Sequence, residues 1–193
     1  MTISQKDYLK ERPYILMGTG HRPRNYVEYK DYKNSLGILV DSISDVIKKK
    51  EIKVSAVITG MAIGFDTALA MYAVYNNIPL FSYIPFVGQE YDWSVDMQLT
   101  YQKLIKRAAK IHVSVDHRPT DYKKITAALH KRNSDMLKDT DLCLTFHRPE
   151  ITTGGTANVI QKARARKIPT IPIWEEYEKK AKEANILIKD LNK

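Results

Sequence analysis

The chain has 193 residues, 44% of them hydrophobic and 27% charged, which is typical of one globular domain with a substantial core. Lysine and arginine (31) outnumber aspartate and glutamate (22), and the net charge of +9 favours anionic partners such as nucleotides, nucleic acid or acidic surfaces. No apolar run is long enough to cross a bilayer, and the polar opening segment lacks the apolar centre of a secretion signal. We therefore expect one cytoplasmic domain over residues 1–193, with residues 1–12 flexible and no membrane association.

Short apolar runs alternate with segments of helical periodicity along the chain. In chain order the pattern predicts a strand at 14–17, a helix at 32–50, a strand at 54–59, a helix at 66–76, a strand at 79–85, a helix at 94–109, a strand at 111–115, a helix at 124–138, a strand at 142–146, a helix at 157–167, a strand at 170–174 and a helical tail from Glu175 that includes Ile188. This alternation predicts a mostly parallel sheet with helices on both faces. The single cysteine, Cys143, lies in an apolar strand and is expected to be a buried thiol.

Glycines follow the first two predicted strands, at Gly18-Thr19-Gly20 and at Gly60-Met61 to Gly64. Ligands of parallel α/β sheets bind beyond the carboxyl ends of the strands, which is where both segments fall. These glycines either bring backbone amides to an anion or only reverse the chain, and the sequence leaves both interpretations open.

The segment from Thr153 to Asn158 is the strongest candidate for a binding site. Gly154 and Gly155 stand between Thr153 and Thr156, where a predicted strand leads into a helix. Glycines allow a ligand close to the backbone, and the start of a helix attracts anions. Threonine hydroxyls add hydrogen bonds and a helix cap. We expect this segment, with Asn158, to bind phosphate or ribose.

Two arginines are candidates for neutralising that phosphate. His21 and Arg22 directly follow the first strand, and the Arg132-Asn133 pair lies in a helix whose apolar side would lean toward the same crevice. Asp66 stands in the first turn of its helix, where a carboxylate either caps backbone amides or takes part in catalysis.

The segment from Phe86 to Trp93 contains aromatic residues after the third strand. One interpretation is that Phe86 and Trp93 stack on a flat base while Gln89 contacts its edge. The alternative is ordinary aromatic packing under a loop.

Several classes of protein are excluded by missing motifs. The five histidines and the lone cysteine show no zinc-site spacing, so we expect no metal. No Gly-x-Ser-x-Gly elbow and no P-loop is present, which argues against classical serine hydrolases and P-loop NTPases.

Five blocks of sequence, in order, resemble the YpsA-like proteins of the SLOG superfamily, which is named for its Smf/DprA and LOG relatives. They are GTGHRP (18–23), ITGMAIGFDTALA (58–70), IPFVGQEYDW (84–93), RNSDML (132–137) and TTGGTANVIQKA (152–163). Many such proteins are encoded by bacteria, phages or prophages. The resemblance implies a Rossmann-like three-layer α/β sandwich with a mostly parallel sheet that binds nucleotides or nucleotide-derived signals.

The resemblance to LOG enzymes, which are phosphoribohydrolases, is incomplete. Their signature pairs an arginine with PGGxGTxxE, whose glutamate assists cleavage at the ribose; Arg132 resembles that arginine, but the glutamate position holds Val159. Without that carboxylate the stabilisation of an oxocarbenium-like centre is missing, unless Asp66 or Glu90 supplies it. We therefore lean toward a protein without enzymatic activity, with Arg132 as the catalytic candidate if it is an enzyme.

The sequence thus predicts a protein that binds a nucleotide or nucleotide-derived molecule as a sensor or sequestering protein, and, if it is a phage protein, captures an immune nucleotide signal in the host cytoplasm. Residues 153–156 and 18–20 would hold phosphate, and no other cofactor is expected. The alternatives are a LOG-like phosphoribohydrolase and DprA-like single-strand nucleic-acid binding; the latter is disfavoured because the positive charge forms no concentrated stripe. Related proteins often pair through their helices, so we expect a homodimer or homotetramer.

Overall fold

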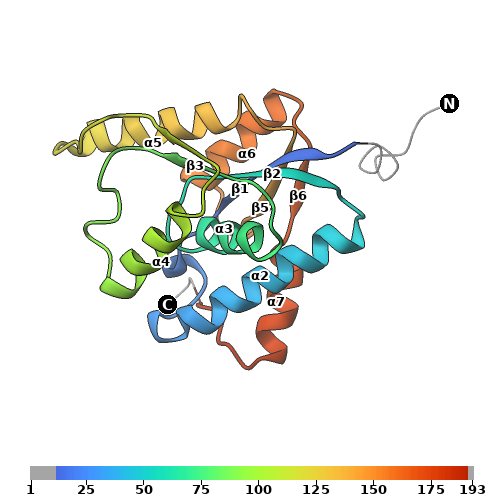
Figure 1. Ribbon diagram of the computed structural model, residues 1–193. Coiled ribbons are helices and arrows are strands. Elements are labelled where there is room, and N and C mark those ends of the chain that lie inside the picture. Colours follow the sequence, from blue (N-terminus) through green and yellow to red (C-terminus); the bar gives the residue numbers. More distant parts are fainter. Residues whose placement is uncertain (1–11, 191–193) are drawn as a thin grey trace.

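The computed structural model of the protein describes residues 12–190, so the expectation for the first 11 residues lies outside it. A six-stranded sheet forms the centre of the fold, and every neighbouring pair of strands is parallel (Figure 1). The order is β4-β3-β2-β1-β5-β6, made by β1 (Tyr14–Gly20), β2 (Val54–Thr59), β3 (Leu80–Ile84), β4 (Lys110–Val113), β5 (Leu142–Phe146) and β6 (Thr170–Pro172). The predicted parallel α/β sheet is confirmed.

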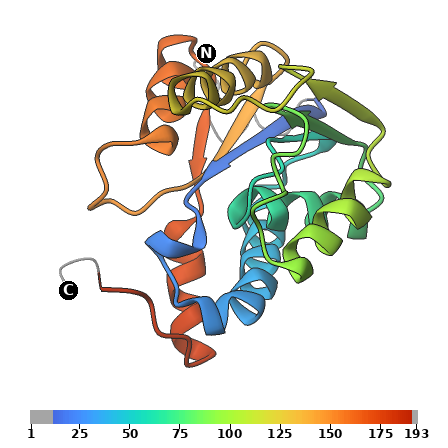
Figure 2. The same ribbon diagram turned by 90° about the vertical axis from the view of Figure 1, so that its left-hand side faces the viewer.

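Helices cover both faces of the sheet and complete three layers (Figures 1 and 2). One face carries α2 (Tyr32–Lys49), α3 (Phe65–Tyr75), α4 (Val95–Ile105) and α7 (Trp174–Glu183), and the other carries α5 (Tyr122–Met136) and α6 (Gly155–Ala165). Among the described residues, no helix has both the length and the apolar character needed to cross a membrane.

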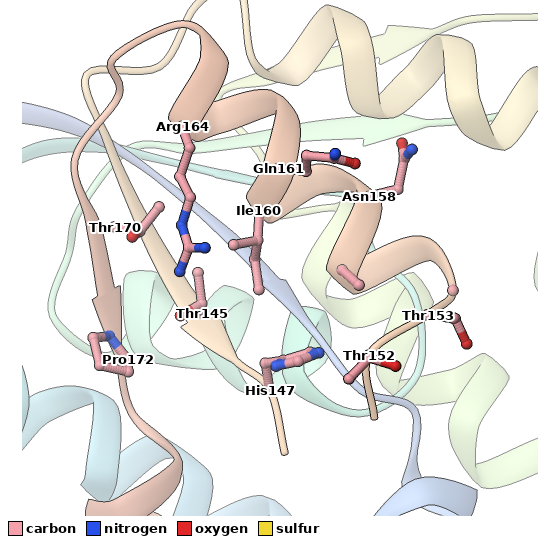
Figure 3. A pocket seen from close by; sticks show the side chains of 12 residues that line it. Thr145, His147, Thr152, Thr153, Asn158, Ile160, Gln161, Arg164, Thr170 and Pro172 are labelled. Carbon is pink, nitrogen blue, oxygen red and sulfur yellow. The ribbon is translucent and has the colours of Figure 1, made fainter. Parts of the chain in front are cut away.

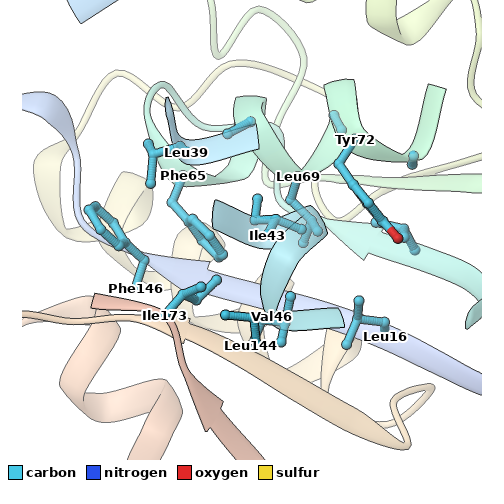
Figure 4. Packing of buried hydrophobic residues seen from close by; sticks show 14 of the residues in the cluster. Leu16, Leu39, Ile43, Val46, Phe65, Leu69, Tyr72, Leu144, Phe146 and Ile173 are labelled. Atoms are coloured by element: carbon cyan, nitrogen blue, oxygen red, sulfur yellow. The ribbon is translucent and has the colours of Figure 1, made fainter. Parts of the chain in front are cut away.

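The apolar runs of the central strands are continuous because these strands are buried on both faces. In β1, Leu16 packs in the large core beneath α2 and α3, whereas its neighbour Met17 packs in a smaller cluster with Val159 of α6. The large core contains Phe65 and Phe146, whose rings stack 5.6 Å apart (Figure 4). Burying each such side chain contributes about 1.5–3 kcal/mol, so this contact helps to hold α3 against β5.

The predicted turn at Gly18-Thr19-Gly20 is wrong, because β1 continues through Gly20 and these residues pair with Leu144 to Phe146 of β5. A β-carbon at residue 18 would lie 2.4 Å from Cδ2 of Leu69, and one at residue 20 would lie 2.4 Å from Cβ of Phe65. Both glycines therefore let α3 approach the strand closely.

The predicted C-terminal helix is also too long. α7 ends at Glu183, and Ile188 instead forms an antiparallel bridge with Val27. The backbone N–H of Lys189 donates to the carbonyl of Tyr26. The end of the described chain therefore lies against the segment that follows β1.

Candidate functional site

The loops after β1, β2 and β5 meet at the carboxyl edge of the sheet, where the strand order reverses between β1 and β5. The backbone N–H of His21 donates to the carbonyl of Phe146 at 3.0 Å. A β-carbon on Gly64 would lie 2.8 Å from the carbonyl oxygen of His21, so the loop after β2 touches the loop after β1. In sheets of this topology, this crevice is the usual place for a ligand.

A buried arginine and a buried aspartate face each other at the end of β2. Arg132 of α5 is 6% exposed and Asp66 of α3 is 8% exposed, and Nη1 of the arginine lies 3.6 Å from Oδ2 of the aspartate. A β-carbon at Gly60 would fall 1.4 Å from that Nη1, so only glycine leaves room for the guanidinium there. Gly60 thus leaves the space that Arg132 occupies.

The arginine retains hydrogen-bonding capacity. Within residues 12–190, Nε and Nη1 of Arg132 have no hydrogen-bond partner, whereas Oδ2 of Asp66 accepts the backbone N–H of Ala62 at 3.3 Å. Burial raises the pKa of Asp66, and the charge of Arg132 opposes that rise. Burial lowers the pKa of Arg132, but a guanidinium stays charged at neutral pH.

Arg22 extends the positive charge toward solvent. Its side chain is exposed, and burial of part of it lowers its pKa, with Arg24 acting in the same direction and Asp66 opposing. Two arginines and one aspartate thus lie close together at this edge, which leaves a net positive charge there. Asn133, next to Arg132 on α5, is half-buried.

The side chain of His21 is held by contacts within the protein. Its Nε2 accepts the backbone N–H of Arg148 at 2.9 Å, and Nδ1 lies 3.4 Å from the side-chain amide of Asn25. Burial, followed by the charges of His147 and Arg148, lowers the pKa of His21 to about 4. The ring is therefore neutral at pH 7, and it joins the end of β1 to the loop after β5.

The start of α6 is open to solvent. Gly154 has φ +95°, a left-handed conformation that favours glycine, and precedes the first helical residue, Gly155. Apart from the adjacent residues and the backbone of the helix itself, no described atom lies within 4 Å of where a β-carbon would stand on either glycine, and Thr152 and Thr153 are exposed as well. The expected threonine cap is absent among the described residues, because no side chain accepts an N–H at this helix end. These amides are therefore available to a ligand.

The other members of this segment are less exposed. Thr156 and Asn158 are half-buried, and Oδ1 of Asn158 is buried with no hydrogen-bond partner in the described part of the chain. Val159, at the position of the LOG glutamate, is 1% exposed and packs against the sheet.

A groove of about 690 Å³ runs along α6 on its β5–β6 side (Figure 3). It begins at Thr152–Gly154 and reaches Arg164 in the last turn of the helix. Its walls and floor are formed by Thr145, His147, Thr152, Thr153, Gly154, Ala157, Asn158, Ile160, Gln161, Arg164, Thr170 and Pro172. His147, Gln161 and Arg164 are not among the residues predicted from the sequence.

The segment from Phe86 to Trp93 packs inward. Phe86 is 7% exposed, and the ring of Trp93 makes an edge-to-face contact with Tyr101 at 5.6 Å. The side-chain amide of Gln89 donates to the carbonyl of Met61 at 3.4 Å. All three side chains therefore contact other parts of the protein, in agreement with the interpretation that these residues pack under a loop.

The remaining predicted residues are structural neighbours of the crevice. Thr19 is 8% exposed in β1, and Met61 is 2% exposed with φ +55°.

The expected burial of Cys143 is confirmed, and that burial raises the pKa of its thiol to about 12. In residues 12–190, no group of three His, Cys, Asp or Glu side chains is arranged to hold a metal ion.

The fold and this edge define a Rossmann-like α/β protein with a positively charged crevice at the carboxyl ends of its strands. A family model described as the YspA SLOG family (YpsA) matches residues 16–175, so the chain belongs to this SLOG family. No curated protein matches the chain.

A search of solved structures finds the X-ray structure of DNA processing protein A (DprA) from Streptococcus pneumoniae. The TM-score is 0.52 at 14% sequence identity, and the match covers 91% of this chain and 58% of that chain. The two proteins therefore share a fold, and this chain spans less than two thirds of the length of that protein.

Proposed function

We propose that this protein binds a nucleotide or nucleotide-derived small molecule at the carboxyl edge of its sheet. The observation that carries the proposal is the open start of α6, where exposed residues 152–155 lead into a helix with no side-chain cap. The first-turn amides and the positive end of the helix dipole suit a phosphate group. The free space above Gly154 and Gly155 lets that group approach the backbone.

The surroundings support an anion larger than phosphate alone. Arg22 and Arg132 add positive charge that Asp66 only partly offsets. The adjoining groove, at about 690 Å³, falls within the usual size of small-molecule sites. In this proposal the groove holds the rest of the ligand, because Phe86 and Trp93 are already packed against the protein.

Isothermal titration calorimetry of the full chain with AMP, ADP-ribose, NAD and cyclic nucleotides tests the proposal. We expect saturable binding of at least one compound. Uniform absence of heat from folded protein would contradict the proposal. Binding of a single-stranded oligonucleotide alone, with affinity falling steeply with salt, would instead indicate a nucleic-acid-binding protein.

Cleavage of an N-glycosidic bond is a second candidate because the carboxylate of Asp66 lies beside Arg132. Chromatography of AMP incubated with the protein would detect a released base, and the release would be lost in Asp66→Asn. If AMP binds but stays intact, the protein acts by binding, as a sensor or a sequestering protein.

A further inference from the structure

The groove along α6 carries positive charge at both of its ends. One end is the open helix start at Gly154, and the other is the guanidinium of Arg164, which Figure 3 shows directed along the groove toward Thr145. Within residues 12–190, the Arg164 side chain makes no hydrogen bond or ion pair, and the twelve lining residues include no carboxylate. Each end of the groove is therefore suited to an anionic group.

The floor between these ends offers polar groups. His147 lies beside Thr152 in Figure 3, and its Nε2 is buried without a hydrogen-bond partner in the described chain. Gln161 and Thr170 also line the groove, and Ile160 provides an apolar surface. A buried polar atom without a partner is costly, so a ligand that bonds to His147 would remove that cost.

The two positive ends are too far apart for one phosphate group. Arg164 is ten positions after Gly154, which corresponds to about 15 Å along the helix axis at about 1.5 Å per residue. Side chains tilt toward the helix start, so the guanidinium lies on the order of 10 Å from the first-turn amides. A mononucleotide phosphate occupies only one of the two ends.

We infer that the site takes nucleotides that carry a second anionic group, and that Arg164 binds this group. The inference rests on the proposed function, because the start of α6 must hold the first phosphate. Arginine forms two parallel hydrogen bonds to a phosphate, which makes it the specificity-determining residue for the second group.

Two ligand pairs that differ by one phosphate test this inference by calorimetry: AMP against adenosine 3′,5′-bisphosphate, and NAD against NADP. The variants are Arg164→Gln and the matched control Arg166→Gln, which removes the same charge from an exposed residue that does not line the groove. We expect the wild-type protein to prefer the additional phosphate in at least one pair by about tenfold or more, as for a hydrogen bond to a charged group. Arg164→Gln should abolish the preference for the additional phosphate, and Arg166→Gln should preserve it.

Equal affinities within both pairs for the wild-type protein, or a preference that survives in Arg164→Gln, would overturn the inference. AMP binding in that case would still support the proposed function. If none of the four compounds binds, the inference fails, and if ADP-ribose and the cyclic nucleotides also give no heat, the proposed function fails with it.

Discussion

Substituting Gly155 by aspartate separates the folding of α6 from its ability to bind an anion. Residue 155 is the first residue of α6, and apart from its chain neighbours and the backbone of α6 no described atom lies within 4 Å of the added β-carbon. A carboxylate at a helix start stabilises the helix by about 0.3–1 kcal/mol, and replacing a helical glycine adds a few tenths. For a chain of 193 residues we expect the melting temperature to stay level or rise by about 2–4 °C.

The same carboxylate should prevent phosphate binding. It occupies the space above the first-turn amides and repels a ligand of like charge. Losing one hydrogen bond to a charged group costs about 1.5–3 kcal/mol, so AMP should bind about 10- to 100-fold more weakly. Calorimetry gives the affinity, and differential scanning fluorimetry gives the melting temperature.

Gly37→Asp is the matched control. Residue 37 lies on the exposed side of α2, where an added β-carbon also meets no described atom within 4 Å, and the substitution changes the net charge by the same amount. AMP affinity should be unchanged in this control. The reasoning would be refuted if Gly155→Asp were folded and bound AMP as tightly as Gly37→Asp.

Two further substitutions test the packing around the crevice. Gly60→Ala would place a β-carbon 1.4 Å from Nη1 of Arg132, so displacement of the guanidinium should lower the unfolding free energy by about 1–3 kcal/mol in urea; an unchanged midpoint would contradict this. The pKa of His21 is about 4 in the folded protein, against about 6.5 in the unfolded chain. The contribution of neutral His21 to the unfolding free energy is therefore complete above pH 6.5 and is lost as the pH falls toward 4, by up to about 3 kcal/mol. The glutamine of His21→Gln has an amide oxygen that can accept the N–H of Arg148, so this variant should show a flatter dependence of unfolding free energy on pH between 7 and 4.5. If the unfolding free energy of the variant fell as steeply as that of the wild-type protein, His21 would not be the group responsible.

Much of the fold could be predicted from the sequence because periodicity is a local property. Each predicted strand corresponds to a strand of the sheet, and the parallel arrangement follows from the helices between them. A pair of glycines, however, can indicate either a turn or a close contact between two elements. The pattern Gly18-Thr19-Gly20 is typical of a turn, but its cause is the contact with Phe65 and Leu69, more than 40 residues further along the chain.

The geometry of the candidate site could be predicted from the sequence only in part. The open start of α6 follows from its glycines, and Arg132 does lie in the crevice, but its partnership with Gly60 and Asp66 depends on how α5 crosses the sheet. Arg164 gave no local signal, because it becomes part of a groove only where β6 pairs with β5 beneath α6.

Nuclear magnetic resonance titration of the isotope-labelled protein with AMP tests the central claim most directly, since it reports on each backbone amide. We predict that the largest shift changes fall on the amides of Gly155, Thr156 and Ala157, with smaller changes at Arg22. Saturation of AMP binding with these amides unmoved, and with the changes at the opposite edge of the sheet near Tyr14 and Val54, would contradict the account.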